Sequence, residues 1–238
     1  MDTIILFSII ILVASVLQAS TGFGFSIMAT PFLLLIYEPR EAIQLNLILS
    51  LVISFVLIMK IRKDVDIAIM KRFILGSVPG LPIGISIFLW LEMTILKLAV
   101  SVLVLVLTVL LILQYRLKQT TIRDFVVGGL SGGFTTSIGM PGPPLLLYFS
   151  GTNTTKEKLR GTTLAFYLWI YLVSLVIQVV IAGTSEEIWI SSLKGLPLVI
   201  VGLIVGQLLF KRINQKLFRV LTYVLLFFTG LYLLIQQF

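Results

Sequence analysis

The sequence predicts an all-α polytopic membrane protein with a single domain, residues 1–238. Its composition is the first reason: 58% of the residues are hydrophobic, only 12% are charged, and the mean hydropathy is +1.13. Soluble domains are instead about half apolar and a quarter charged. Apolar runs long enough to cross a bilayer recur along the chain, and basic residues gather between them. These features predict a multi-pass protein of the cytoplasmic membrane.

Six apolar runs have the length of a membrane span, because about 20 helical residues cross the roughly 30 Å hydrocarbon core. The predicted spans are Ala42–Met59, Phe73–Leu91, Leu96–Leu113, Thr162–Ala182, Ile188–Leu209 and Val220–Ile235. Two further regions do not fit a single span. Thr3–Tyr37 is too long and is broken at Thr21–Gly24, and Phe125–Phe149 is interrupted at Ser131–Gly133 and again at Gly139–Pro144.

The distribution of basic residues predicts the topology. Most of the 18 Lys and Arg residues lie in four loops, within Lys60–Arg72, Arg116–Arg123, Lys156–Arg160 and Lys211–Arg219. The positive-inside rule makes these loops cytoplasmic. Phe125–Phe149 therefore enters and leaves on one side, which favours a re-entrant hairpin of two half-helices. Thr3–Tyr37 is either the matching hairpin or two full spans.

Related features in the two halves predict two repeats, 1–115 and 123–238. A shift of 118 positions aligns Pro79 and Gly84 with Pro197 and Gly202, and a shift near 110 aligns Ser20–Phe23 with Leu130–Gly133. Each repeat then holds a broken or re-entrant helical hairpin plus three transmembrane helices. The odd number of full spans inverts one repeat relative to the other, a pattern typical of secondary transporters. The alternative is that apolar helices simply look alike.

The residue types exclude several kinds of chemistry. The chain contains no Cys and no His, which removes thiol nucleophiles, imidazole bases and the common zinc ligands. We therefore predict no catalytic residue, no metal and no cofactor, and no enzyme. No Asp, Glu or Arg falls inside a predicted span, so coupling to H⁺ or Na⁺ is left open. The net charge of +8 reflects topology rather than nucleic-acid binding.

The interrupted helices supply the candidate binding site. In a bilayer, broken helices occur only where they are buried in protein or line a cavity, and a half-helix N-terminus attracts anions. Glycines admit an oxyanion close to the backbone, and hydroxyl and amide groups add hydrogen-bond donors. The candidate substrate-binding residues are Gln18, Ser20, Thr21, Gly22 and Gly24; Ser131, Gly132, Gly133, Thr135, Thr136, Ser137 and Gly139; and Gln44, Asn46 and Thr162. The alternative roles are tight helix crossing and interhelical hydrogen bonding.

Two segments resemble a known family. Gln18–Phe25 followed by Pro31, and Gly128–Phe134 followed by Met140–Pro144, are similar to the duplicated signature of the TauE/SafE (TSUP) sulfite exporters. The resemblance covers essentially the whole chain. It implies transport of sulfite, thiosulfate or organosulfonates, in either direction.

The expected partners are a small anionic substrate and the lipid bilayer, with no nucleic acid; a homodimer is left open. Two functional alternatives also stay open at this point. One is an anion channel on the same scaffold, and the other is a carrier for other small organic anions such as carboxylates.

Overall fold

The computed structural model describes residues 3–90, 119–150 and 154–212, together with Thr152 and scattered positions between 92 and 109 and between 220 and 235. All regular structure in these parts is helical, which confirms the all-α class. Five of the described helices are long and apolar enough to cross a membrane. The predicted spans Leu96–Leu113 and Val220–Ile235 lie outside the continuously described residues.

Four predicted spans correspond to long helices. These are α3 (Pro39–Ile61), followed by the short 3₁₀ helix η1 (Arg62–Asp64), then α4 (Ile67–Trp90), α8 (Lys156–Ala182) and α9 (Glu186–Arg212). Each helix extends beyond the apolar run that predicted it at one end or both. The difference matters most in α8, which begins at Lys156 rather than Thr162 and therefore includes Arg160 within its first turns.

The first broken region consists of one long helix and one short helix. α1 (Thr3–Thr21) has 19 residues and is long enough to span, whereas α2 (Phe25–Leu33) has nine. The chain turns between them at Gly22 and Gly24, whose φ angles are 86° and 120°. Glycine suits this left-handed region because it has no Cβ. Thr3–Tyr37 is thus a broken pair of one long and one short helix, and not two full spans.

The second broken region has one interruption, not the predicted two. α6 (Thr121–Ile138) continues through Ser131–Gly133, and it ends where Gly139 adopts a φ of 71° before α7 (Gly142–Ser150). The prediction of a break at Ser131–Gly133 was wrong because local glycine content does not decide helicity where a neighbouring helix packs closely. The breaks at Gly22 and Gly139 stand 117 positions apart, so the shift near 110 was wrong too.

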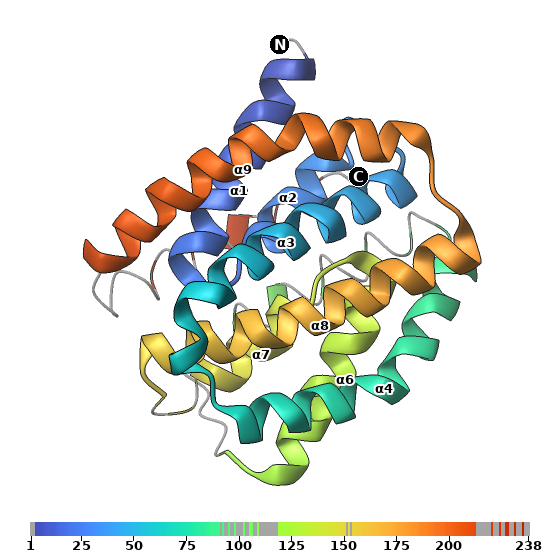
Figure 1. The fold of residues 1–238 in the computed structure, drawn as a ribbon. Helices are drawn as coiled ribbons and strands as arrows, with labels where there is room; N and C mark the ends of the chain where they lie inside the picture. The colour runs from blue at the N-terminus through green and yellow to red at the C-terminus, as the bar shows by residue number, and fades with distance from the viewer. Residues whose placement is uncertain are drawn as a thin grey trace.

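The helices are arranged around a central pair, α3 and α8 (Figure 1). α1 crosses α9 on one side of this pair, and α4 crosses α6 on the other. α3 is the most enclosed candidate span: 67% of its apolar 18-residue window is buried, against 39–44% of the corresponding windows in the other four. Exposed apolar side chains on the outer helices, such as Ile83, Leu193 and Ile204, suit contact with lipid acyl chains. This arrangement buries both breaks beside the central helices.

Glycines permit the closest crossings. A Cβ placed on Gly80 of α4 would lie 2.1 Å from the carbonyl oxygen of Gly129 in α6. On the opposite side, a Cβ on Gly202 of α9 would lie 2.4 Å from Cβ of Ser15 in α1. Small residues allow membrane helices to approach until their backbones touch. The two crossings are therefore built from the same kind of contact.

Candidate functional site

Each break lies against the central helix that comes from the other half of the chain. A Cβ on Gly22 would lie 2.9 Å from Cγ of Arg160 in α8. A Cβ on Gly139 would lie 2.7 Å from Nδ2 of Asn46 in α3, and this amide donates a hydrogen bond of 2.8 Å to the Gly139 carbonyl oxygen. The two breaks are thus held by α8 and α3.

The N-termini of the short helices α2 and α7 meet beside two tyrosines of α8. Gly142 begins α7, and a Cβ on it would lie 3.1 Å from Cδ1 of Ile27 in α2 and 3.0 Å from the hydroxyl oxygen of Tyr167. The Tyr171 hydroxyl donates to Oγ of Ser26, in the first turn of α2, at 3.4 Å. The two tyrosine rings lie 5.0 Å apart, centroid to centroid. One tyrosine therefore reaches the start of each short helix.

The Tyr167 hydroxyl is the most informative atom in this region. The side chain is 0% exposed, yet its hydroxyl has no hydrogen-bond partner among the described residues. Buried hydroxyls are normally paired, because an unpaired one has lost its water without compensation. The first N–H groups of a helix also lack partners within the helix. An unpaired hydroxyl beside two helix N-termini is suited to a small anion.

A buried polar stripe continues along α8 in both directions from Tyr167. Its members are spaced three or four residues apart and are all 0% exposed: Thr163, Tyr167, Tyr171, Ser174 and Gln178. Such spacing places them on one helix face. A second stripe on α3 consists of Asn46, Ser50 and Ser54, also 0% exposed. The spacing was visible in the sequence, but it was not recognised there because tyrosine and serine also occur in apolar membrane cores.

Several of the predicted site residues attach to these stripes. Gln18 donates to the carbonyl oxygen of Ser50 at 3.3 Å and to Oγ of Ser54 at 3.1 Å. Thr136 shares a hydrogen bond of 2.9 Å with Ser174. The side-chain carbonyl of Gln18 is buried without a partner among the described residues. Gln18, Asn46 and Thr136 therefore lie on the polar interior that joins the breaks to the central helices.

The hydroxyls nearest to the breaks bond mainly to their own helices. Ser20 and Thr21 donate to the Leu17 carbonyl, and Thr21 also bonds Phe23 across the first break. Thr135 and Ser137 donate to carbonyls one turn back in α6, at 2.5 and 2.7 Å. Hydroxyls bonded in this way keep a free lone pair and can redirect their proton.

The remaining predicted binding residues lie at a helix cap, at a helix crossing or away from the breaks. Gly24 caps α2, whereas Gly132 and Gly133 face α4, and a Cβ on Gly132 would lie 2.7 Å from the Ser77 carbonyl oxygen. The Ser131 hydroxyl, also in α6, is buried without a partner among the described residues. The structure does not place Gln44 or Thr162 at a break. Gln44 donates to the Gly183 carbonyl at 2.8 Å, and Thr162 accepts from the Asp66 backbone N–H at 2.9 Å.

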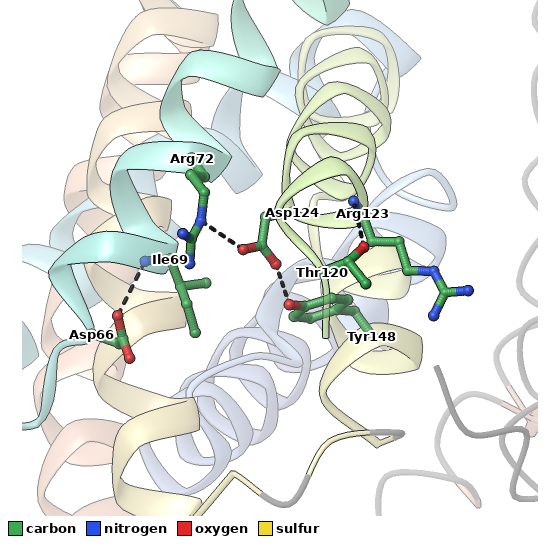
Figure 2. A network of polar contacts seen from close by, with 7 residues as sticks. All are labelled: Asp66, Ile69, Arg72, Thr120, Arg123, Asp124 and Tyr148. Atoms are coloured by element: carbon green, nitrogen blue, oxygen red, sulfur yellow. Dashed lines mark hydrogen bonds and ion pairs between the residues drawn. The ribbon is translucent and has the colours of Figure 1, made fainter. Parts of the chain in front are cut away.

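A buried ionic network, missed in the sequence, anchors α7 (Figure 2). Asp124, in the first turn of α6, is 0% exposed. One of its carboxylate oxygens accepts a hydrogen bond from Tyr148 of α7, and the other lies 2.7 Å from Nε of Arg72 in α4. Asp124 lies just outside the predicted limits of its segment, so hydropathy gave no signal for its burial. The network ties the second short helix to the α4–α6 pair.

Two other features of the structure do not favour a competing site. A cavity of about 820 Å³ lies between the starts of α1 and α9, and Glu186, Glu187 and Lys194 are among the residues that line it. Its two carboxylates outnumber its one amine, which disfavours anions. No group of three potential acidic ligands gathers around a metal position among the described residues.

Comparison with known families decides the class of protein. A family model described as "Sulfite exporter TauE/SafE" matches residues 7–233. The chain belongs to the TauE/SafE family. No curated protein and no solved structure matches it. The TauE/SafE assignment, together with the apolar helices, makes the chain an integral membrane protein of a transporter family.

The TauE/SafE family confirms the resemblance noted in the sequence and implies a small anionic substrate and lipid as partners. Both signature segments lie at or next to the breaks. Gln18–Phe25 contains the end of α1, the first break and the start of α2. Gly128–Phe134 lies within α6, and Met140–Pro144 follows Gly139 directly and contains the start of α7. The segments that carry the resemblance to the family thus lie in the interrupted helices.

Proposed function

We propose that this chain is a secondary transporter that moves small sulfur-containing anions, such as sulfite, thiosulfate or organosulfonates, across the cytoplasmic membrane. The anion binds where the N-termini of α2 and α7 meet. The observation that carries this proposal is the buried hydroxyl of Tyr167, which lies beside the start of α7 and has no hydrogen-bond partner in the described part of the chain. Helix N-termini and hydroxyl donors together stabilise an oxyanion without a metal or a covalent step. Such a site suits reversible binding and release.

Two inverted repeats within one domain, residues 1–115 and 123–238, provide the framework for alternating access. Among the continuously described residues, the α-helices of the first half have 19, 9, 23 and 24 residues, and those of the second have 18, 9, 27 and 27. Packing supports the same relation, because α1 pairs with α9 as α6 pairs with α4. A two-fold axis between the halves produces such an exchange of partners.

The polar stripes follow the same relation. Asn46, Ser50 and Ser54 of α3 stand 117 positions before Thr163, Tyr167 and Tyr171 of α8, and the same shift separates Gly22 from Gly139. Both stripes are buried. Side chains at matched positions on the central helices thus give the anion polar contacts along a path through the bilayer. The α1–α9 and α4–α6 pairs move relative to this central pair, so that the site opens to one side at a time.

A transport screen tests the proposed function. Purified protein in proteoliposomes is assayed with sulfite, sulfate, thiosulfate, sulfoacetate and carboxylate analogues. We expect counterflow-stimulated uptake of the sulfur oxyanions. The Thr21→Leu and Ser137→Leu variants should still insert into the membrane, but we expect them to lose this uptake because each substitution adds bulk at a break. Normal transport in both variants would contradict the site. Preference for carboxylates, or flux without counterflow, would instead support the carrier of organic anions or the channel.

Cysteine labelling tests the topology, since the chain has no Cys of its own. Ser185 lies before α9 and Thr154 lies before α8. With the basic loops inside, Ser185→Cys should react with an impermeant maleimide from outside the cell, and Thr154→Cys only after the membrane is opened. A reversed pattern would overturn the orientation. Reaction of both positions from one side would overturn the re-entrant second region.

A further inference from the structure

Arg160 is a buried cation that the proposed site does not yet use. It lies in the second turn of α8 and is 5% exposed. One terminal nitrogen donates to the Ala19 carbonyl near the end of α1, and the guanidinium carbon lies 4.3 Å above the Phe210 ring. Its Nε is buried and has no hydrogen-bond partner among the described residues. Arg160 therefore holds a buried N–H donor that no described group satisfies.

No described carboxylate forms a salt bridge with Arg160, and Asp64 acts on its charge only through an electrostatic interaction at longer range. All of the ten Asp and Glu residues except Asp2 lie in the described part of the chain. Within that part, ion pairs join Arg72 to Asp124 and Lys156 to Glu157, and neither of them involves Arg160. A charge removed from water is costly unless a counter-charge and hydrogen bonds compensate it. One carbonyl, one aromatic ring and the more distant Asp64 carboxylate compensate it only in part.

The position of Arg160 connects it to the proposed pathway. Its side chain packs on Gly22 at the first break, with Cγ 2.9 Å from where a Cβ would lie. It precedes Thr163 by one turn, so it stands at the end of the α8 polar stripe. The Thr163 hydroxyl is also buried without a partner among the described residues. The matching position in α3, 117 residues earlier, is Ile43, so the charge belongs to one half only.

We propose that Arg160 and Thr163 form an oxyanion subsite at the cytoplasmic end of the α8 stripe. The subsite takes a sulfite, a thiosulfate or the sulfonate group of a larger anion through charge-assisted hydrogen bonds from the guanidinium. This inference rests on the proposed function, because it names an additional contact for the same anion. Its rival is a purely structural role in which Arg160 caps the C-terminal carbonyls of α1.

Equilibrium binding of sulfite and of thiosulfate to the purified full-length protein tests the subsite. We expect Arg160→Gln to raise the Kd for sulfite at least about tenfold, since charge-assisted hydrogen bonds are the strong ones. Arg160→Lys should retain part of the affinity, because it keeps the charge and loses the planar fork. Lys158→Gln is the matched control: it removes an exposed cation from the same turn and should leave the Kd unchanged.

Ligand-free melting temperatures separate the subsite from the structural role. Arg160 variants that have a lower melting temperature but bind sulfite with the wild-type Kd would overturn the subsite. Should Arg160→Gln not fold, an Arg160→Lys variant that folds and binds like the wild type would overturn it equally. Tyr167→Phe keeps the two proposals distinguishable. If this variant loses binding while the Arg160 variants keep it, the result supports the site at the N-termini of α2 and α7 and overturns the Arg160 subsite. A wild-type protein that binds neither anion would refute both.

Discussion

Tyr167→Phe should reduce sulfite uptake at least about tenfold without lowering the stability of the protein. A hydrogen bond to a charged group contributes roughly 1.5–3 kcal/mol, and about 1.4 kcal/mol corresponds to a factor of ten. The hydroxyl has no hydrogen-bond partner among the described residues, so its removal breaks no described hydrogen bond. Initial uptake rates in proteoliposomes and thermal melting in detergent measure the two effects.

Tyr37→Phe provides the matched control for this change. The Tyr37 hydroxyl donates to Ser191 at 3.0 Å, and it lies in the connection that follows α2 rather than at the start of a short helix. The control should transport at the wild-type rate. Wild-type uptake by Tyr167→Phe would refute the role of this hydroxyl in anion binding, and a large loss in Tyr37→Phe would show that tyrosine hydroxyls matter for reasons other than the site.

Gly80→Ala should destabilise the protein by about 3 kcal/mol, at the upper end of what overpacking costs. Its new methyl group would stand 2.1 Å from the Gly129 carbonyl oxygen, and a backbone atom cannot move aside as a flexible side chain can. The α4–α6 crossing must therefore separate. Denaturation in mixed micelles, followed by circular dichroism, measures the loss of stability.

Gly133→Ala is the control on the facing helix, because its methyl group would lie 3.6 Å from the Gly80 carbonyl oxygen, an ordinary contact. It should fold normally. Its transport rate then separates the two roles considered for Gly133: an unchanged rate indicates helix packing, whereas a loss of transport in a stable protein indicates contact with the anion. Wild-type stability of Gly80→Ala would contradict the packing of α4 on α6.

Sequence patterns predicted much of the fold because they depend on properties that act locally. Apolar length located α3, α4, α8 and α9, since each helix must cover the hydrocarbon core whatever packs beside it. The breaks at Gly22–Gly24 and Gly139–Pro141 were visible because a chain reversal needs residues that tolerate positive φ or cannot donate a backbone hydrogen bond. The break predicted at Ser131–Gly133 was wrong because glycine also occurs where two helices cross closely. Local composition does not distinguish a glycine in a break from a glycine at a helix crossing.

The sequence by itself determined the membrane class, the all-helical architecture, the segments that carry the breaks, and the TauE/SafE signature. Only the tertiary structure decided which polar groups are buried and which of them have hydrogen-bond or ion-pair partners. Tyr167, Arg160 and Asp124 look unremarkable in the chain, because burial and hydrogen bonding depend on neighbours distant in sequence. Gly142 reaches Tyr167, Ala19 reaches Arg160, and Arg72 reaches Asp124 only after the helices cross.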